Sequence, residues 1–129
     1  MTPQATVFAP MLIIRDGIAA IEFYIKALGA QELRHWSNDD GSIHVAELHI
    51  NGALFYLRQE GTGHIAPQQH SGVTAIHHLL TDNPDALFNQ AIAAGATQLS
   101  PMQDFDYGYR QGVLRDPFGH EWSIGKKLV

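Results

Sequence analysis

The sequence contains one internal repeat, and this repeat limits the possible folds more than any other feature. A segment that begins at Asp16 reaches Gly29 thirteen residues later, and a second segment that begins at Asp82 reaches Gly95 after the same interval. Each follows a short run rich in β-branched residues and leucine, and each leads into further strand-like segments. The order β-α-β-β-β therefore occurs twice, at an offset of about 66 residues, which indicates a duplicated domain.

Each copy has signals that begin and end a helix. In the first copy Asp16 can accept hydrogen bonds from exposed backbone N–H groups, and Gly29 supplies the left-handed residue at which helices commonly end. In the second copy Asp82 or Asn83 is the cap, and Gly95 ends the helix. The apolar stripes expected to pack on a sheet are Ile18, Ile21, Ile25 and Leu28 in the first helix and Leu87, Phe88, Ala91 and Ile92 in the second.

Short β-branched and aromatic runs separated by turn signals predict eight strands. Asn51-Gly52 is a two-residue hairpin signal, and a turn at 116–119 precedes the last strand. The segment 100–109 is interpreted as a long aromatic loop, either a flexible cover over a hydrophobic cleft or a dimer contact. The expected strands cover residues 11–15, 32–37, 43–50, 53–58, 76–80, 97–99, 110–115 and 120–126.

The chain of 129 residues, 45% of them apolar, has enough material for one domain with its own core. We expect a single domain over 1–129. The first module covers about 7–59 and the second about 73–127. A Gly-, Pro- and Gln-rich segment at about 60–72 is expected to be a surface linker.

Composition excludes several classes of function. The chain has no cysteine, so it cannot form a disulfide, a thiolate metal site or a cysteine nucleophile. The net charge of −5 comes without a Lys/Arg cluster, which argues against nucleic acid as a partner. No apolar run reaches the roughly 18 residues of a membrane span, and the N-terminus lacks the features of a signal peptide. We therefore expect a cytoplasmic protein with no membrane partner.

Three stretches carry a resemblance to a known family: MLIIRDGIAAIEFYIKALGAQEL, HVAELHINGALFYL and YGYRQGVLRDPFGHEWSIG. The chain resembles the vicinal-oxygen-chelate superfamily of glyoxalase I, bleomycin-resistance proteins and extradiol dioxygenases, and most closely its PhnB-like branch. The resemblance implies an α+β fold in which two βαβββ modules form a curved eight-strand mixed sheet around a cleft, with the helices on the outer face. It also implies a homodimer that completes the cleft. It does not imply one reaction, because members of this superfamily perform several.

The metal-using members hold a divalent ion on four strands, and each of those positions can be checked by the resemblance. The first falls on Ala9, the second on Tyr56 and the fourth on Ser123. The third falls near Ile76, or on His77 after a one-residue shift. Such an ion needs several oxygen or nitrogen ligands to offset its dehydration. We expect no metal and no cofactor at this position.

The eight histidines of the chain raise the alternative of a metal site outside the family position. His44 and His49 are five residues apart, and His77 and His78 are adjacent, so each pair points to opposite faces of a strand. Exposed or hydrogen-bonded structural histidines are the favoured interpretation. Proton transfer by a histidine in the cleft remains an alternative.

Strand alternation sorts the cleft candidates. If Tyr56 faces the cleft, Arg58 faces it too, whereas Phe55 and Leu57 pack under the helix. By the same rule Ser123 shares its face with Glu121, whereas Trp122 belongs to the core. Arg110 is expected to meet a ligand anion, and Arg115 to pair with Asp116 or its turn. The candidate ligand-binding residues are Tyr56, Arg58, Glu47, Arg110, Glu121, Ser123, Tyr107, Tyr109 and Trp36.

Together these features favour a small-molecule-binding protein with a metal-free cleft that sequesters an antibiotic or a metabolite, with a cationic or aromatic compound as the preferred ligand. The first alternative is a lyase, isomerase or dioxygenase of the same superfamily that uses replacement metal ligands, or an acid/base catalyst without metal. The second alternative is a non-catalytic subunit that associates as a dimer with another protein.

Overall fold

The computed structural model describes residues 3–67 and 72–128. Its elements follow the repeat. The first module contains β1 (Met11–Ile14), α1 (Gly17–Leu28), β2 (Gln31–Ser37), β3 (Ile43–Ile50) and β4 (Ala53–Gln59). The second contains β5 (Ile76–Leu80), α2 (Pro84–Ala93), β6 (Thr97–Phe105), β7 (Tyr109–Arg115) and β8 (Glu121–Lys127).

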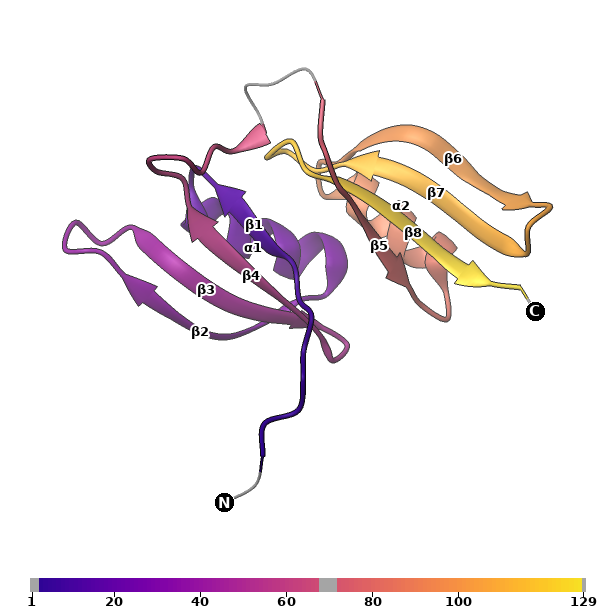
Figure 1. The fold of residues 1–129 in the computed structure, drawn as a ribbon. Coiled ribbons are helices and arrows are strands. Elements are labelled where there is room, and N and C mark those ends of the chain that lie inside the picture. Colours follow the sequence, from indigo (N-terminus) through magenta and orange to yellow (C-terminus); the bar gives the residue numbers. More distant parts are fainter. Residues whose placement is uncertain (1–2, 68–71, 129) are drawn as a thin grey trace.

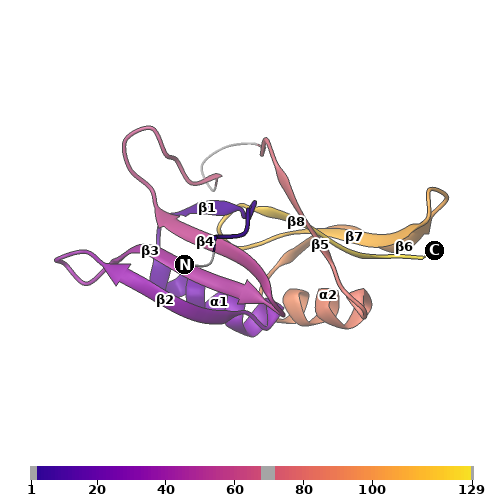
Figure 2. The same ribbon diagram turned by 60° about the horizontal axis from the view of Figure 1, so that its bottom comes forward.

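The strands form two mixed sheets of four strands each, in the orders β1-β4-β3-β2 and β5-β8-β7-β6. In each sheet the first strand pairs in parallel with the last one of its module, and the other pairs are antiparallel. Figure 1 shows the two sheets side by side, and Figure 2 shows both helices on the same side of them. The α+β class and the duplicated modules are confirmed, with the eight strands divided into two sheets. We call the side of each sheet away from its helix the open face.

Both helices begin at the capping residues that the repeat indicates. The Asp16 side chain accepts from the backbone N–H of Ala19, and the Asn83 side chain accepts from that of Ala86. Asn83, not Asp82, is therefore the second cap. Gly29 ends α1 with a left-handed φ of 67°.

The buried face of α1 differs from the expected one. Ile21 and Leu28 are buried, but Ile18 is 52% exposed and Ile25 is 45% exposed. The face that packs on the sheet is centred on Tyr24, which has no exposed surface. The tyrosine ring takes the central position because its hydroxyl has a buried partner from the second module.

That partner is Asp116, which joins the two modules inside one core. The Tyr24 hydroxyl donates to Oδ2 of Asp116 at 2.5 Å, and Nε1 of Trp122 donates to the same oxygen at 2.9 Å. The Tyr24 ring also contacts the rings of Phe55, Phe118 and Trp122. Burial, with the Asp116 carboxylate as a second cause, raises the pKa of Tyr24 well above its usual value. Trp122 is a core residue, as alternation predicts.

The prediction of a long loop at 100–109 is wrong. β6 continues through Phe105, and a short turn at 106–108 joins it to β7. β6 contains Pro101, and the pairing of β6 with β7 has register shifts between Gln98 and Ser100 and between Ser100 and Gln103. Such irregularities accommodate a proline in an edge strand. The aromatic residues of this segment therefore belong to a hairpin and not to a mobile cover.

The described part of the expected linker is attached to the first module. The Glu60 carboxylate accepts from the backbone N–H of Ala66 at 3.0 Å and pairs with Arg15 at 2.9 Å. Ala66 is completely buried. Residues 68–71 of the expected linker lie outside the described residues. Neither described helix has the length and apolar character that a membrane span requires.

Candidate functional site

The open face of the first sheet carries four of the candidate residues. Tyr56 lies opposite Glu47, and Arg58 lies opposite Val45. Phe55 and Leu57, on the other face of β4, are buried under α1. This is the sorting that strand alternation predicts.

Glu47 and Trp36 on this face both contact the same arginine. The Arg34 guanidinium donates to the Glu47 carboxylate at 3.1 and 3.2 Å. Its carbon Cζ lies 5.1 Å from the centre of the Trp36 ring. The carboxylate of Glu47 is thus neutralised by a neighbour, and one face of the Trp36 ring is occupied.

The open face of the second sheet carries four more candidates. Ser123 lies opposite Val113 in the pairing of β7 with β8, and Glu121 lies opposite Arg115. Nη2 of Arg115 lies 3.5 Å from Oε2 of Glu121, so Arg115 pairs with this carboxylate and not with Asp116. Tyr109 is on the same face, near the exposed Tyr107.

The rings on this second face form a continuous series, which we call the aromatic row: Phe105, Tyr107, Tyr109 and His78. The Phe105 and Tyr107 rings stack with centres 5.2 Å apart and an angle of 18° between their planes. Tyr107 lies 6.0 Å from Tyr109, and Tyr109 lies 6.0 Å from His78. Gln111 donates from Nε2 to the Tyr107 hydroxyl at 3.0 Å. The row offers adjacent aromatic faces on a surface that no helix covers (Figure 2).

Arg110 lies on the other face of β7, away from Tyr109. Its guanidinium donates to both carboxylate oxygens of Asp85 at 2.8 and 2.7 Å, and to Asp104 at 3.0 Å. Asp85 is in the first turn of α2. Arg110 therefore forms an ion-pair bridge between β7 and α2. It lies on the opposite side of the sheet from the other candidates of the second module.

We expect Arg110→Gln to lower the melting temperature at low ionic strength, and to lower it less at high ionic strength, because salt screens exposed ion pairs. Hydrogen bonds from Arg110 lower the pKa of Asp85. The pair therefore stabilises the fold above the usual aspartate pKa of about 3.9, and this contribution is lost as pH falls through the lowered folded value. Melting followed by circular dichroism across this pH range measures it, with Lys127→Gln as the control. An unchanged low-salt melting temperature would contradict the bridge.

The four family metal positions do not fit a divalent ion. Ala9 and Ile76 carry no donor atom. Ser123 is 6% exposed, and its hydroxyl oxygen has no hydrogen-bond partner among the described residues. A lone hydroxyl and the phenol of Tyr56 are a poor ligand set for an ion that requires several charged or imidazole ligands.

The histidines do not complete this set. His77 faces Trp122, with ring centres 5.2 Å apart, so the one-residue shift would direct its side chain away from the open face. His78 is the histidine opposite Ser123. Nδ1 of His49 accepts from the backbone N–H of Gly52 at 2.9 Å, which is a structural role. Within 3–67 and 72–128, no group of three or more His, Asp or Glu side chains is placed to hold a metal ion.

Sequence reasoning missed three contributors to the open faces. His78 and Phe105 extend the aromatic row, and Arg34 neutralises Glu47. Alternation along β5 places His78 with Ile76 on the open face, so the period-two rule could have found it. Arg34 could not be assigned in this way, because β2 is irregular between Glu32 and Arg34.

Comparison with known proteins agrees with this architecture. An uncharacterised protein from Mycobacterium bovis is 37% identical over 125 residues, which are 93% of this chain and 82% of that protein. The crystal structure of TioX from Micromonospora sp. ML1 superimposes with a TM-score of 0.78 at 24% identity, covering 96% of this chain and all of TioX. A gene product from Arabidopsis thaliana gives a TM-score of 0.74 at 25% identity, covering 95% of this chain and all of that one.

The model of one protein family matches residues 6–124, which include the first module, the second module as far as Ile124 in β8, and the whole aromatic row. The chain belongs to the glyoxalase/bleomycin resistance protein/dioxygenase superfamily.

Proposed function

We propose that this protein, a member of the PhnB-like branch, binds a planar aromatic cation by stacking on the aromatic row, without a metal ion. The observation that carries the proposal is the set of four rings on an uncovered sheet face. The donor-poor residues at the family metal positions support it, because chelation chemistry needs an ion that these side chains cannot hold. Binding and sequestration of the ligand is then the function.

Stacking supplies the main part of the affinity. An aromatic pair contributes about 0.5 to 1.5 kcal/mol beyond the burial of its area. Tyr107 and Tyr109 present ring faces at adjacent positions, and the bond from Gln111 fixes the Tyr107 hydroxyl. A ligand with two or three fused rings can contact both tyrosines at once.

The preference for a cation comes from the rings and from the charge of the chain. The face of an aromatic ring attracts positive charge, and the protein has a net charge of −5. Glu47 and Glu121 attract a cationic ligand less strongly than their charges suggest, because Arg34 and Arg115 already pair with them. We therefore assign cation recognition to the tyrosine rings.

A second copy of the chain would close the cleft. Both open faces expose large apolar side chains, and a soluble protein rarely leaves such a surface uncovered unless it binds something. Two chains that bring open faces together would enclose a ligand between aromatic walls. The exposed residues that support this arrangement are Met11 and Trp36 on the first sheet, Ile76 and Leu80 on the second, and Tyr107 in the turn between β6 and β7.

Isothermal titration with proflavine, a planar cation, and acridine, a neutral analogue, tests the proposal. We expect proflavine to bind about tenfold more tightly, which corresponds to about 1.4 kcal/mol. Tyr109→Ala should remove most of this affinity, whereas Arg110→Gln, the next residue on the opposite face, should retain it. Light scattering on the same samples should show a mass of twice 14.2 kDa.

Three results would contradict the proposal or part of it. Absence of binding by both compounds would remove the binder function and leave the interaction subunit as the better explanation. Stoichiometric zinc, nickel, iron or manganese in protein purified without a histidine tag would favour the metal-dependent enzyme instead. Equal affinity for the two compounds would reject the preference for a cation.

A further inference from the structure

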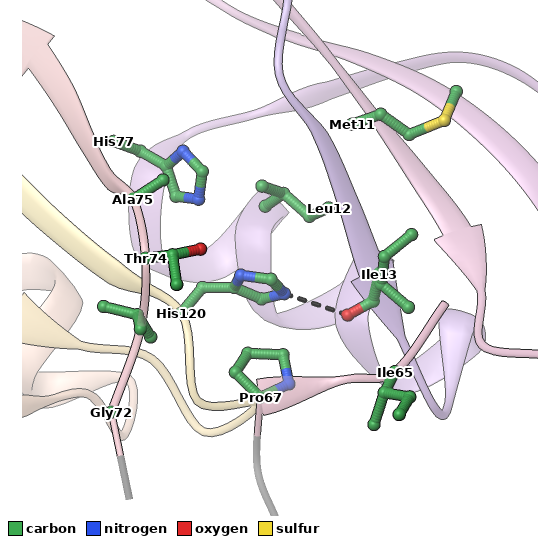
Figure 3. A pocket seen from close by; sticks show the side chains of 11 residues that line it. Met11, Leu12, Ile13, Ile65, Pro67, Gly72, Thr74, Ala75, His77 and His120 are labelled. Atoms are coloured by element: carbon green, nitrogen blue, oxygen red, sulfur yellow. Dashed lines mark hydrogen bonds between the residues drawn. The ribbon is translucent and has the colours of Figure 1, made fainter. Parts of the chain in front are cut away.

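A second candidate site lies in the seam between the two modules. β1 and β5 are edge strands of their sheets. Among the described strands, no backbone pairing joins β1 to β5 across the space between the two sheets. A pocket of about 480 Å³ lies there, which we call the seam pocket. Figure 3 shows it between β1, the 65–67 segment and the start of β5. Its volume is within the range of ordinary small-molecule sites.

The seam pocket shares no residue with the aromatic row. His77 lines it, whereas the adjacent His78 faces Tyr109 on the open face. The two sites therefore lie on opposite sides of β5, and a ligand in one does not contact the side chains of the other.

The pocket wall is largely apolar and contains no Lys, Arg, Asp or Glu side chain. Leu12, Ile13 and Ile65 form much of it. The polar side chains among the lining residues are Thr74, His77 and His120, and Figure 3 shows them around the same space. A carboxylate or phosphate would meet no Lys or Arg here, so burial of an anion in this pocket would be costly.

The imidazoles of His77 and His120 differ in whether they have a hydrogen-bond partner. Nε2 of His120 lies 2.9 Å from the carbonyl oxygen of Ile13, which requires that this nitrogen donate. The His77 ring centre lies 5.7 Å from that of His120. Among the described residues, the structure gives the His77 ring nitrogens no hydrogen-bond partner. His77 is thus a half-buried imidazole with an acceptor available to a ligand.

The charge state of His77 favours a neutral ligand. Burial and the neighbouring His120 lower the pKa of His77, and Asp116 opposes this shift in part. His120 and Asp116 are the titratable groups that act on it. The ring is therefore neutral at physiological pH, and its unprotonated nitrogen can accept a hydrogen bond from a hydroxyl.

We propose that the seam pocket binds a neutral, apolar molecule with one hydroxyl group, of the phenol class, with the hydroxyl donating to His77. The apolar ring of such a compound fits the walls formed by Leu12, Ile13 and Ile65, and Thr74 supplies a second polar contact for the same oxygen. This site is independent of the proposed cation site.

Three probes of similar shape test the chemistry: 2-naphthol, 2-methylnaphthalene and 2-naphthoate. In isothermal titration we expect 2-naphthol to bind at least about fivefold more tightly than the other two, the gain that one hydrogen bond typically provides. In spectra of protein with ¹⁵N-labelled histidine, 2-naphthol should shift the imidazole signals of His77 and His120 and leave that of His78 in place.

Variants locate the site. His77→Phe and Thr74→Val should each weaken 2-naphthol binding, with His77→Phe losing about fivefold, and should leave 2-methylnaphthalene unchanged. His44→Phe, at an exposed position of β3, is the control. Binding of 2-naphthol by the wild-type protein should also weaken as pH falls through the lowered pKa of His77, since protonation removes the acceptor.

Three outcomes would overturn the proposal. Tighter binding of 2-naphthoate would reject the neutral class. Shifts at His78 in place of His77 would move 2-naphthol to the open face. Full affinity in both His77→Phe and Thr74→Val would show that neither polar group is used. The labelled-histidine spectra need no variant, so the test remains decisive if His77→Phe fails to fold.

Discussion

Replacement of Asp116 by alanine is expected to lower the free energy of unfolding by about 3 to 5 kcal/mol, because several buried donors lose their acceptor at about 1 to 3 kcal/mol each. Asp116 is 3% exposed and accepts four hydrogen bonds. Urea unfolding followed by far-ultraviolet circular dichroism, at one fixed protein concentration, measures the effect.

The cost is large because every donor to Asp116 is left without a partner. One carboxylate oxygen accepts from the Tyr24 hydroxyl and from Nε1 of Trp122. The other accepts from the backbone N–H groups of Phe118 and His120, at 2.9 and 3.0 Å. Each buried donor without a partner costs about 1 to 3 kcal/mol. Since Tyr24 belongs to α1 and the others to the second module, the loss weakens the contact between modules.

Graded variants separate this bridge from a general loss of packing. Asp116→Asn keeps the shape of the side chain, but an NH₂ group replaces one of the two acceptor oxygens. One pair of donors keeps its acceptor and the other loses it, so the effect on stability should be intermediate. Tyr24→Phe removes one donor and should cost about 1 kcal/mol. Asp82→Ala, at an exposed position beside the cap, should change stability by less than about 0.5 kcal/mol. Equal stability of Asp116→Ala and Asp82→Ala would contradict the bridge.

The parts of the fold that follow from local periodicity were predictable. The caps at Asp16 and Asn83 and the hairpin at 51–52 depend on residues that are close in sequence. The two faces of β4 and β8 follow from a period of two, which placed Tyr56 and Ser123 opposite to the buried side chains. The sequence therefore predicted which side chains of β4 and β8 are buried and which lie on the opposite face.

Features that depend on distant partners were not predictable in the same way. Tyr24 has a polar hydroxyl, and its burial depends on Asp116, which is 92 residues away. Arg110 depends on Asp85, which is 25 residues away. Alternation along β7 would have grouped Arg110 with the buried Leu114, but Arg110 was assigned from its position after the expected aromatic loop, so the strand rule was not applied to it.

Two of the four rings of the aromatic row were predicted from the sequence as ligand-binding residues. Tyr107 and Tyr109 were recognised as a pair of candidate walls, whereas their contacts with Phe105 and His78 require the hairpin and the parallel pairing of β5 with β8. Pairing between strands that are distant in sequence decides which rings meet. A sequence pattern can place a ring on a face but cannot identify its neighbour on the next strand.

Gly125→Ala tests how the backbone supports the aromatic row, with an expected loss of about 2 kcal/mol in the free energy of unfolding. A Cβ atom at this position would lie 2.5 Å from the backbone oxygen of Arg110 and 2.7 Å from Cβ of Gln111. The backbone oxygen cannot rotate away as a side chain can, so β7 and β8 must move apart. Urea unfolding measures the loss, with Gly61→Ala as the control, since an added Cβ there meets no atom within 4 Å.

The same substitution should also weaken ligand binding, because Gln111 lies opposite Gly125 and holds the Tyr107 hydroxyl. A shift of Gln111 would release that hydroxyl and change the angle between Tyr107 and Tyr109. We therefore expect Gly125→Ala to reduce proflavine affinity severalfold even in conditions where the variant is fully folded, whereas Gly61→Ala should retain it. Wild-type affinity in a folded but destabilised Gly125→Ala would show that the row does not depend on the close approach of these two strands.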